Sequence, residues 1–124
     1  MKMDIESNYT LTEGLTAAER TADTYYTASV DHAGGNCAAF FVSLGTYATS
    51  FVATVQHSDD DSSFTDEADT TYGNEVSLTL TAAGSGTLNV PNPRARYSRV
   101  KVVVGGTNTF SVTNILGPKR FIDA

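Results

Sequence analysis

Apolar and polar residues alternate most clearly over residues 94–104, which end in Arg-Val-Lys-Val-Val-Val. A period of two is typical of a β-strand with one face in a core and the other toward water or a partner. The two sets that would lie on opposite faces are Val100, Val102 and Val104 against Tyr97, Arg99, Lys101 and Val103. The pattern therefore predicts a half-buried strand that is also unusually basic.

The same period recurs in shorter segments that are separated by turn residues. We expect further strands at residues 25–30, 37–44, 51–58, 75–83, 87–90 and 109–115. Residues 37–44 are the most apolar of these and should form a central strand. Residues 84–86 and 105–108 are rich in glycine and predict reversals, the second of which would make residues 96–115 one β-hairpin.

The two ends of the chain have few strongly apolar positions. Residues 1–20 are expected to form an extended N-terminal arm, and residues 117–124 a short C-terminal tail. Thr16 and Glu19 have the spacing of a helix capping box, but no helical period follows, so at most one helical turn is expected there. Residues 21–116 are then the folded sandwich.

Length and composition agree with one all-β domain over residues 1–124. The chain has 124 residues, enough for one core, and it contains eighteen threonines, six tyrosines and six phenylalanines, which favour strands. About seven or eight short strands at turn-separated intervals are typical of an antiparallel β-sandwich or jelly roll. We therefore expect a single β-sandwich with extended terminal arms.

Charge is strongly segregated along the chain, whose net charge is −6. Residues 21–93 have nine acidic residues and no Lys or Arg, whereas residues 94–124 have six bases and one acid. Such a distribution predicts a dipolar surface that suits a charged partner or a second copy. The expected partner interface lies on the basic strand and comprises Arg94, Arg96, Tyr97, Arg99 and Lys101. The alternative is that these bases neutralise the acidic loop of the protein itself.

Six acidic residues between positions 59 and 69 could offer oxygen ligands to calcium: Asp59, Asp60, Asp61, Asp66, Glu67 and Asp69. An EF-hand loop starting at Asp59 would need Gly at its sixth position and Glu at its twelfth, where this chain has Phe64 and Thr70. We therefore expect a mobile, exposed acidic loop that needs no metal, and we predict no cofactor.

No arrangement of nucleophile and base points to an enzyme, so we expect a non-enzymatic protein without catalytic residues. Ser85 lies between two glycines but lacks the five-residue spacing of a nucleophile elbow. Cys37 is the single cysteine and has apolar neighbours, so it is expected to be a small buried hydrophobe. His32 is expected to be an exposed loop residue, because no second metal ligand stands at a familiar spacing.

Three other function classes are disfavoured by the same composition. A sequence pI near 4.6 opposes binding to nucleic acid. No apolar run approaches the roughly 20 residues of a membrane span, and the first residues lack the apolar run of a signal peptide. We therefore expect a soluble protein that is made in the cytoplasm.

Two motifs of this chain resemble motifs that occur in small phage-encoded virion proteins. Residues 55–66, Val-Gln-His-Ser-Asp-Asp-Asp-Ser-Ser-Phe-Thr-Asp, are followed by Arg-Tyr-Ser-Arg-Val-Lys at residues 96–101 and by a Gly-Gly-Thr turn. In the similar proteins a strand ends in a Ser-Asp-Asp-Gly-like turn and a later strand has Arg-Tyr-x-Arg-Val. Asp61 stands here in place of the usual turn glycine, and Phe64 in place of a frequent tryptophan.

The resemblance implies a capsid decoration or cement protein, a jelly-roll-like structural protein of the phage head. Such a protein is made in the host cytoplasm, binds the major capsid protein on the virion surface, and often forms a homotrimer. A related pattern occurs in galactose-binding jelly rolls, so a carbohydrate-binding module is the alternative. The chain has no Trp to serve as a sugar platform, which favours the structural function.

Overall fold

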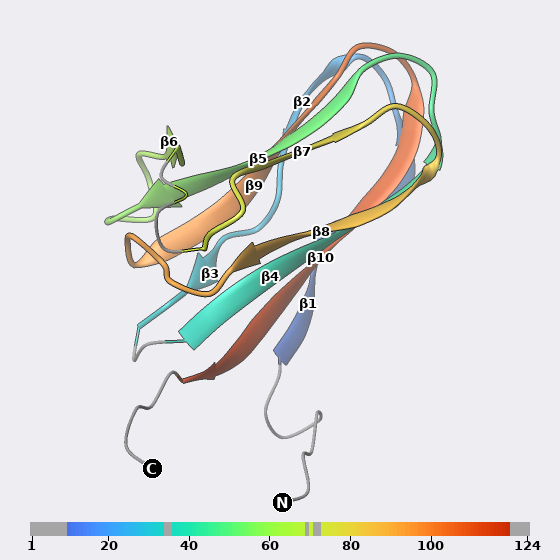
Figure 1. Cartoon of the computed structure of the whole chain (residues 1–124). Coiled ribbons are helices and arrows are strands. Elements are labelled where there is room, and N and C mark those ends of the chain that lie inside the picture. The colour runs from blue at the N-terminus through green and yellow to red at the C-terminus, as the bar shows by residue number, and fades with distance from the viewer. Residues whose placement is uncertain (1–9, 34–35, 69, 71–72, 120–124) are drawn as a thin grey trace, which may run out of the picture.

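The computed structural model describes residues 10–33, 36–68, 70 and 73–119 of the chain. These residues form two antiparallel β-sheets packed face to face, with no helix among them (Figure 1). The prediction of an all-β sandwich is therefore confirmed. The strands in the described part of the chain are β1 (Thr10–Arg20), β2 (Asp23–Tyr26), β3 (Val30–Asp31), β4 (Asn36–Thr46), β5 (Phe51–Ser58), β6 (Thr65–Asp66), β7 (Ser77–Leu80), β8 (Gly84–Val90), β9 (Tyr97–Val104) and β10 (Asn108–Lys119).

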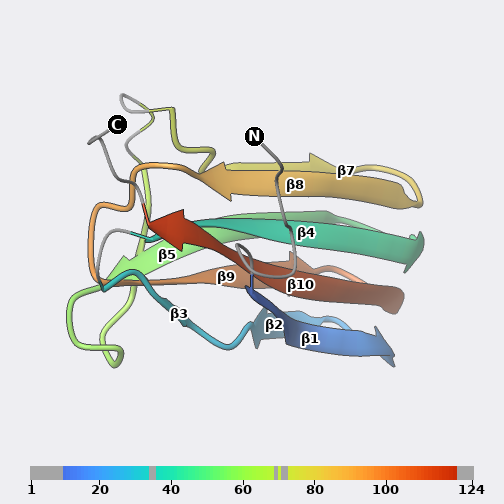
Figure 2. The same cartoon turned by 90° about the horizontal axis from the view of Figure 1, so that it is seen from below.

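The order of the strands is that of a jelly roll. Sheet A has the order β1-β10-β4-β8, which Figure 2 shows side by side. Sheet B has the order β2-β9-β5-β6, and in addition β3 pairs with β9 and β7 pairs with β5. The pairs β1–β10, β2–β9, β4–β8 and β5–β7 are nested one inside the next along the chain. Nested antiparallel pairs divided between two sheets define the jelly-roll arrangement.

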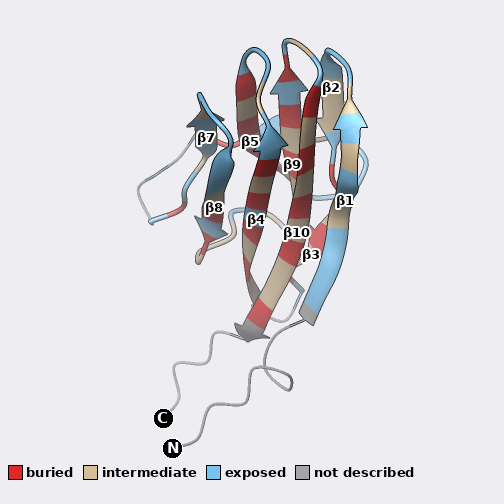
Figure 3. Ribbon diagram, turned by 90° about the vertical axis from the view of Figure 1, so that its right-hand side faces the viewer, coloured by how far each residue is buried: buried red, intermediate tan, exposed pale blue. Residues whose placement is uncertain are grey.

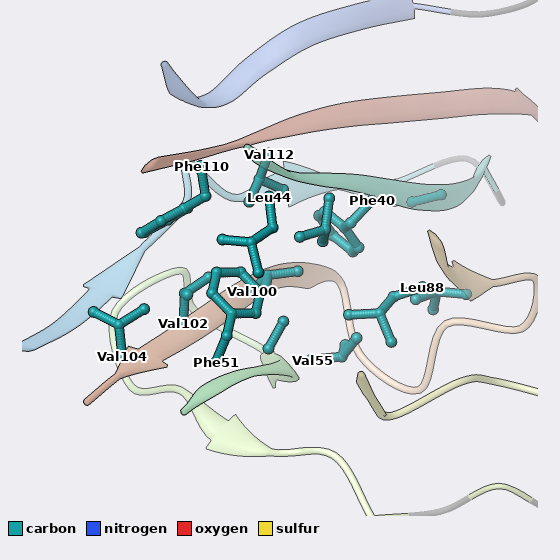
Figure 4. Close-up of a cluster of buried hydrophobic side chains, with 14 of the residues drawn as sticks. Phe40, Leu44, Phe51, Val55, Leu88, Val100, Val102, Val104, Phe110 and Val112 are labelled. Atoms are coloured by element: carbon teal, nitrogen blue, oxygen red, sulfur yellow. The ribbon is translucent and has the colours of Figure 1, made fainter. Parts of the chain in front are cut away.

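The core lies between the sheets and is built by alternate residues of the strands. Val100, Val102 and Val104 of β9 are buried as predicted, and Phe51 and Phe110 meet edge to face with ring centroids 5.2 Å apart (Figure 4). Full burial of each such side chain contributes about 1.5–3 kcal/mol of transfer free energy. The two sheets are held together mainly by these apolar contacts.

The predicted hairpin over residues 96–115 is wrong. β9 pairs with β2, β3 and β5 in sheet B, whereas β10 pairs with β1 and β4 in sheet A. The glycines therefore allow the chain to cross between the sheets. Gly105 N–H donates to Ser50 O at 3.0 Å, and a Cβ on Gly106 would lie 2.6 Å from Thr49 Oγ1, so this crossing lies against the β4–β5 crossing.

The predicted N-terminal arm is wrong from Thr10 onward, because β1 pairs with β10 over its whole length. The register shifts between Glu13 and Leu15 and again between Leu15 and Ala18. These shifts break the period of two, so the sequence pattern did not reveal the strand. Residues 16–19, where at most one helical turn was expected, also belong to β1. At the other end β10 runs to Lys119, so the tail begins later than predicted. Residues 1–9 and 120–124 of the two predicted terminal segments lie outside the described residues.

Several predicted strand boundaries also shift. The expected strand at residues 25–30 is divided into β2 and β3, where Thr27 Oγ1 accepts a hydrogen bond of 2.9 Å from Val100 N–H. The expected strand at residues 75–83 contracts to β7, and the predicted turn at residues 84–86 is instead the start of β8. The prediction that residues 37–44 form a central strand is confirmed, because β4 lies between β10 and β8.

Candidate partner interface

The outer face of sheet B contains most of the predicted interface. Along β9 the inward side chains are buried, while Tyr97, Arg99 and Lys101 are partly exposed on the outward face. Their partners across β5 are Ser58, Gln56 and Thr54 respectively. The alternation of the sequence thus correctly predicted that these three side chains lie on the outward face of β9.

Arg96 is bound by an acid of the same chain. Its Nε–H and Nη2–H groups each donate to one carboxylate oxygen of Asp31 at 3.0 Å. The hydrogen bond from Arg96 is the main reason that the pKa of Asp31 lies below its ordinary value. Arg96 also lies 5.1 Å from the ring centroid of Tyr97. The pair is well exposed, at 55% for Arg96 and 43% for Asp31, so water weakens its attraction.

Lys101 is likewise bound, to Asp66 of β6. Its Nζ donates to the two carboxylate oxygens at 3.0 and 2.9 Å, and Gln56 Nε2 donates to the same carboxylate at 2.9 Å. The Gln56 hydrogen bond, followed by that of Lys101, lowers the pKa of Asp66. β6 pairs with β5 at this point, so the sheet itself brings the acid to Lys101.

Arg99 has a different environment. Its Nε–H donates to the neutral amide oxygen Gln56 Oε1 at 2.8 Å. The guanidinium lies between two rings, 4.2 Å from the centroid of Tyr26 and 3.9 Å from that of Phe64. No carboxylate among the described residues bonds to it. Cation–π contacts hold the group in place without cancelling its charge.

The five predicted residues therefore fall into different situations. Lys101 follows the alternative interpretation, because it neutralises Asp66 of the acidic loop. Arg96 also neutralises an acid of its own chain, but Asp31 lies outside that loop. Arg99 has no ion-pair partner among the described residues and is held in a fixed orientation. Arg94 is exposed on the connection before β9. Whether these residues bind a partner stays a prediction.

The acidic loop after β5 is folded by its own hydrogen bonds. Asp60 Oδ1 accepts from Ser58 Oγ at 2.8 Å and from the backbone N–H groups of Ser62 and Ser63 at 3.0 and 2.9 Å. The bond from Ser63 is the main cause of the lowered pKa of Asp60. Phe64 attaches the loop to the sheet through its contact with Arg99.

Asp61 occupies a position that favours glycine. Its φ is 59°, in the left-handed region that other residues adopt at a cost, and its carboxylate accepts a bond of 2.6 Å from Ser29 Oγ. Glycine adopts this conformation without steric cost. Within the residues that the structure places, no cluster of three or more His, Cys, Asp or Glu side chains is arranged to hold a metal ion, and Asp69 lies outside them.

Both histidines lie in polar contacts that the sequence did not reveal. His32 is only 6% exposed and its Nε2 lies 2.8 Å from Ser98 Oγ, so the prediction of an exposed loop residue is wrong. His57 Nδ1 lies 3.1 Å from Glu67 Oε2, whose side chain is buried. His57 lies opposite Ser98 in the β5–β9 register. This long-range pairing therefore brings the His32–Ser98 contact close to the His57–Glu67 contact.

The outer face of sheet A presents apolar residues that the predicted interface missed. Leu11, Ile115 and Ala39 lie side by side across β1, β10 and β4, and Leu11 is 60% exposed. Phe41, two residues along β4 from Ala39, is 40% exposed. Cys37 is half-buried on this same face, so it is not the core residue that its neighbours predicted. We call these five residues the outer apolar patch.

A hollow of about 470 Å³ opens beside the outer apolar patch. Its lining includes Cys37, Ala38, Ala39, Asn89, Pro91 and Ile115. Figure 3 views sheet A, with exposed residues along β1 and buried bands along β4 and β10. Cys37, Ala39 and Phe41 could be assigned to one face from the sequence, but Leu11 could not, because the β1 register shifts were unknown.

Comparison with known proteins supports the fold and no closer relationship. No family model matches the chain, and no curated protein matches it. One similar solved structure comes from work described as "Bacillus endospore appendages form a novel family of disulfide-linked pili". It aligns with a TM-score of 0.52 and 10% identity, covering 97% of this chain and 98% of that chain. At this identity the likeness shows a shared all-β fold. No helix in the described part of the chain is long and apolar enough to span a bilayer.

Proposed function

We propose that this jelly roll is a non-enzymatic structural protein that acts by binding other protein subunits. In its specific form the proposal is a phage capsid decoration protein, which binds the major capsid protein on the outside of the shell and stabilises it as a homotrimer. The main support is the outer apolar patch, where Leu11 and Phe41 are 60% and 40% exposed on a regular sheet. Contiguous apolar surface of this kind marks protein interaction sites.

The two outer faces suit two kinds of contact. The patch on sheet A offers uncharged apolar surface, which suits association with further copies. On sheet B, Arg99 is held between Tyr26 and Phe64 with no ion-pair partner in the described part of the chain, which suits a carboxylate of the capsid protein. A guanidinium that is already oriented loses little side-chain entropy when it binds.

The pilus subunit supports the proposal only at the level of fold, because it is an all-β chain that is part of an assembled appendage. This chain would need another kind of contact between its copies. It has a single cysteine in 124 residues, so it could form only one disulfide per copy and could not link a series of copies covalently. Non-covalent contacts are therefore the basis of the proposed assembly.

Co-sedimentation with purified capsids that lack the protein tests the specific form of the proposal. We expect saturable binding and a rise in the capsid's resistance to heat or low salt. Light scattering of the free protein should give the mass of a trimer. A protein that stays in the supernatant at every salt concentration and leaves the shell unchanged is not a decoration protein of that capsid.

A carbohydrate-binding module is the second candidate, favoured by the ring of Tyr26. This side chain is 46% exposed on the outer face of sheet B and is backed by Arg99. An exposed ring of this kind can stack on a sugar, and neighbouring polar groups can orient it. Binding on a glycan array that is lost in Tyr26→Ala, without capsid binding, would favour this candidate over the first.

A further inference from the structure

We propose that residues 1–9 of one copy bind the outer apolar patch of a second copy. The inference rests on the proposed function to the extent that both require self-association. It goes beyond that function by naming the segment that binds, the surface that receives it and the side of the segment that faces that surface.

The receiving surface is uncharged where it is most exposed. Leu11, Ile115 and Ala39 form a row across three neighbouring strands, and Phe41 extends it along β4. The outward residues of β4 over positions 37–45 and of β10 over positions 109–115 have no charge, and the acids Glu13 and Glu19 lie on the edge strand β1. An apolar surface without charge is matched best by an equally uncharged strand face.

Residues 1–9 have such a face. Met1, Met3, Ile5 and Tyr9 occupy odd positions, and even positions are all polar. A period of two is that of a strand, in which the odd side chains would all point the same way. Methionine is flexible and fits irregular hollows, such as the one of about 470 Å³ beside the patch.

The position of this segment favours a second copy over its own sheet. The odd series continues into Leu11, which points outward on β1, so a strand formed by this segment would continue β1 in its own direction. Residues 1–13 contain no Gly or Pro, the residues that most readily allow a reversal. Nine extended residues span about 30 Å, twice the roughly 15 Å across the four strands of one sheet. The segment can therefore cross a neighbouring patch.

Each copy would both give a segment and receive one. A contact between two different surfaces is heterologous, and it closes into a ring when the rotation between copies permits. The proposed homotrimer is such a ring, with three segments and three patches all occupied. No patch would then remain exposed to water.

Cys37 makes a built-in reporter, because it lies in the patch and is the single cysteine of the chain. In Ile5→Cys the new thiol lies on the proposed apolar side, and gentle oxidation should link different copies into covalent trimers on a non-reducing gel. Glu6→Cys is the matched control on the opposite side and should link several-fold less. Adding Cys37→Ser should abolish the trimer band, leaving at most dimers.

Two results of this experiment would overturn the proposal. An intramolecular disulfide, seen as a faster monomer band, would place the segment on its own sheet. Equal linking of Ile5→Cys and Glu6→Cys would mean that no particular side faces the patch.

Deletion of residues 2–9 tests the same contact without oxidation and removes no described residue. We expect folded monomers by light scattering with an unchanged circular dichroism spectrum, and the same loss of association for Phe41→Ser, a change at an exposed position. A deletion variant that remains trimeric contradicts this inference. Because capsid co-sedimentation is measured separately, that outcome would leave the decoration function itself standing or falling on its own result.

Discussion

The two outer faces of the sandwich differ in how their interaction groups are already used. On sheet B, Arg96 and Lys101 are bound to Asp31 and Asp66 of the same chain. On sheet A, Leu11 and Phe41 remain 60% and 40% exposed. Two of the bases that the sequence segregates, Arg96 and Lys101, are thus already paired with acids of the same chain, whereas the apolar side chains on sheet A remain exposed.

The two faces should therefore contribute different amounts of free energy to binding. Exposed ion pairs contribute about 0–1 kcal/mol each. Burial of apolar surface contributes roughly 25 cal/mol per Å², so two large side chains can supply several times as much. We therefore expect sheet A to determine the strength of association and Arg99 on sheet B to determine which partner is selected.

The largest expected effect comes from removing the patch. Leu11→Ser with Phe41→Ser should weaken self-association about 10- to 100-fold, because the exposed 60% of Leu11 and 40% of Phe41 would otherwise be buried and would together contribute roughly 1.5–3 kcal/mol. Sedimentation equilibrium would measure the change. The matched control is Val103→Ser on the outer face of sheet B, at 39% exposure, which should leave association unchanged. If Val103→Ser dissociates as readily as the double variant, the conclusion that sheet A rather than sheet B determines the strength of self-association is wrong.

A smaller effect is expected from the bases of sheet B. Arg99→Ser should weaken capsid binding about tenfold at low salt, or about 1.4 kcal/mol, because it removes a charge that no acid among the described residues pairs with. Lys101→Ser should have less effect, since Lys101 already binds Asp66. Quantitative co-sedimentation over a salt series would separate the two variants. Equal losses of capsid binding in both variants would show that binding depends on the net charge of β9 and not on Arg99 in particular.

The contact between Phe64 and Arg99 should contribute modestly to stability. Phe64→Ser removes one of the two rings that enclose the guanidinium, and we expect the free energy of unfolding to fall by about 1 kcal/mol. Urea denaturation would measure it, and hydrogen exchange should show faster exchange confined to residues 59–66. Exchange that rises throughout sheet B would contradict a local role.

The smallest expected effect is a loss of folding stability at acidic pH. The folded-state pKa values of Asp31 and Asp66 are lowered, so these groups stabilise the fold above their unfolded pKa, near 3.9, and this contribution disappears as the pH falls through the lower folded values. Stability should thus be nearly flat from pH 5 to 7 as far as these groups are concerned, and fall below about pH 4. Asp66→Asn should make that fall shallower in urea titrations. An unchanged slope would show that the Lys101 pair does not stabilise the fold.

Alternation along the sequence was enough to predict the core where strands are regular. β4, β5 and β9 keep the period of two, and Val100, Val102 and Val104 were correctly predicted to be buried. β1 was missed because its register shifts twice, which moves Leu11 to one face and Leu15 to the other. The glycines at 105 and 106 indicated a turn, but a turn does not specify the sheet in which the next strand pairs.

The site was less predictable because its contacts join distant positions. Residues 31 and 96 form an ion pair across sixty-five positions, and His32 is buried by Ser98 across sixty-six. The sequence gives the charges but not the pairings, so it overestimated the free charge of β9. Arg99 was found by its alternation, whereas the Tyr26 and Phe64 rings around it had no signal in the sequence.

The pairing of β1 with β10 also has a consequence for synthesis. Thr10 lies opposite Leu116, so the first described strand of the chain cannot join sheet A until the last has left the ribosome. Until then the edge of β4 that β10 will occupy is open, and so is the backbone of β1. Unpaired edges invite pairing with other nascent chains, and folds dominated by distant pairs form slowly. Chains that stop before β10 should therefore aggregate during translation, and fast release with early chaperone binding should favour the correct product.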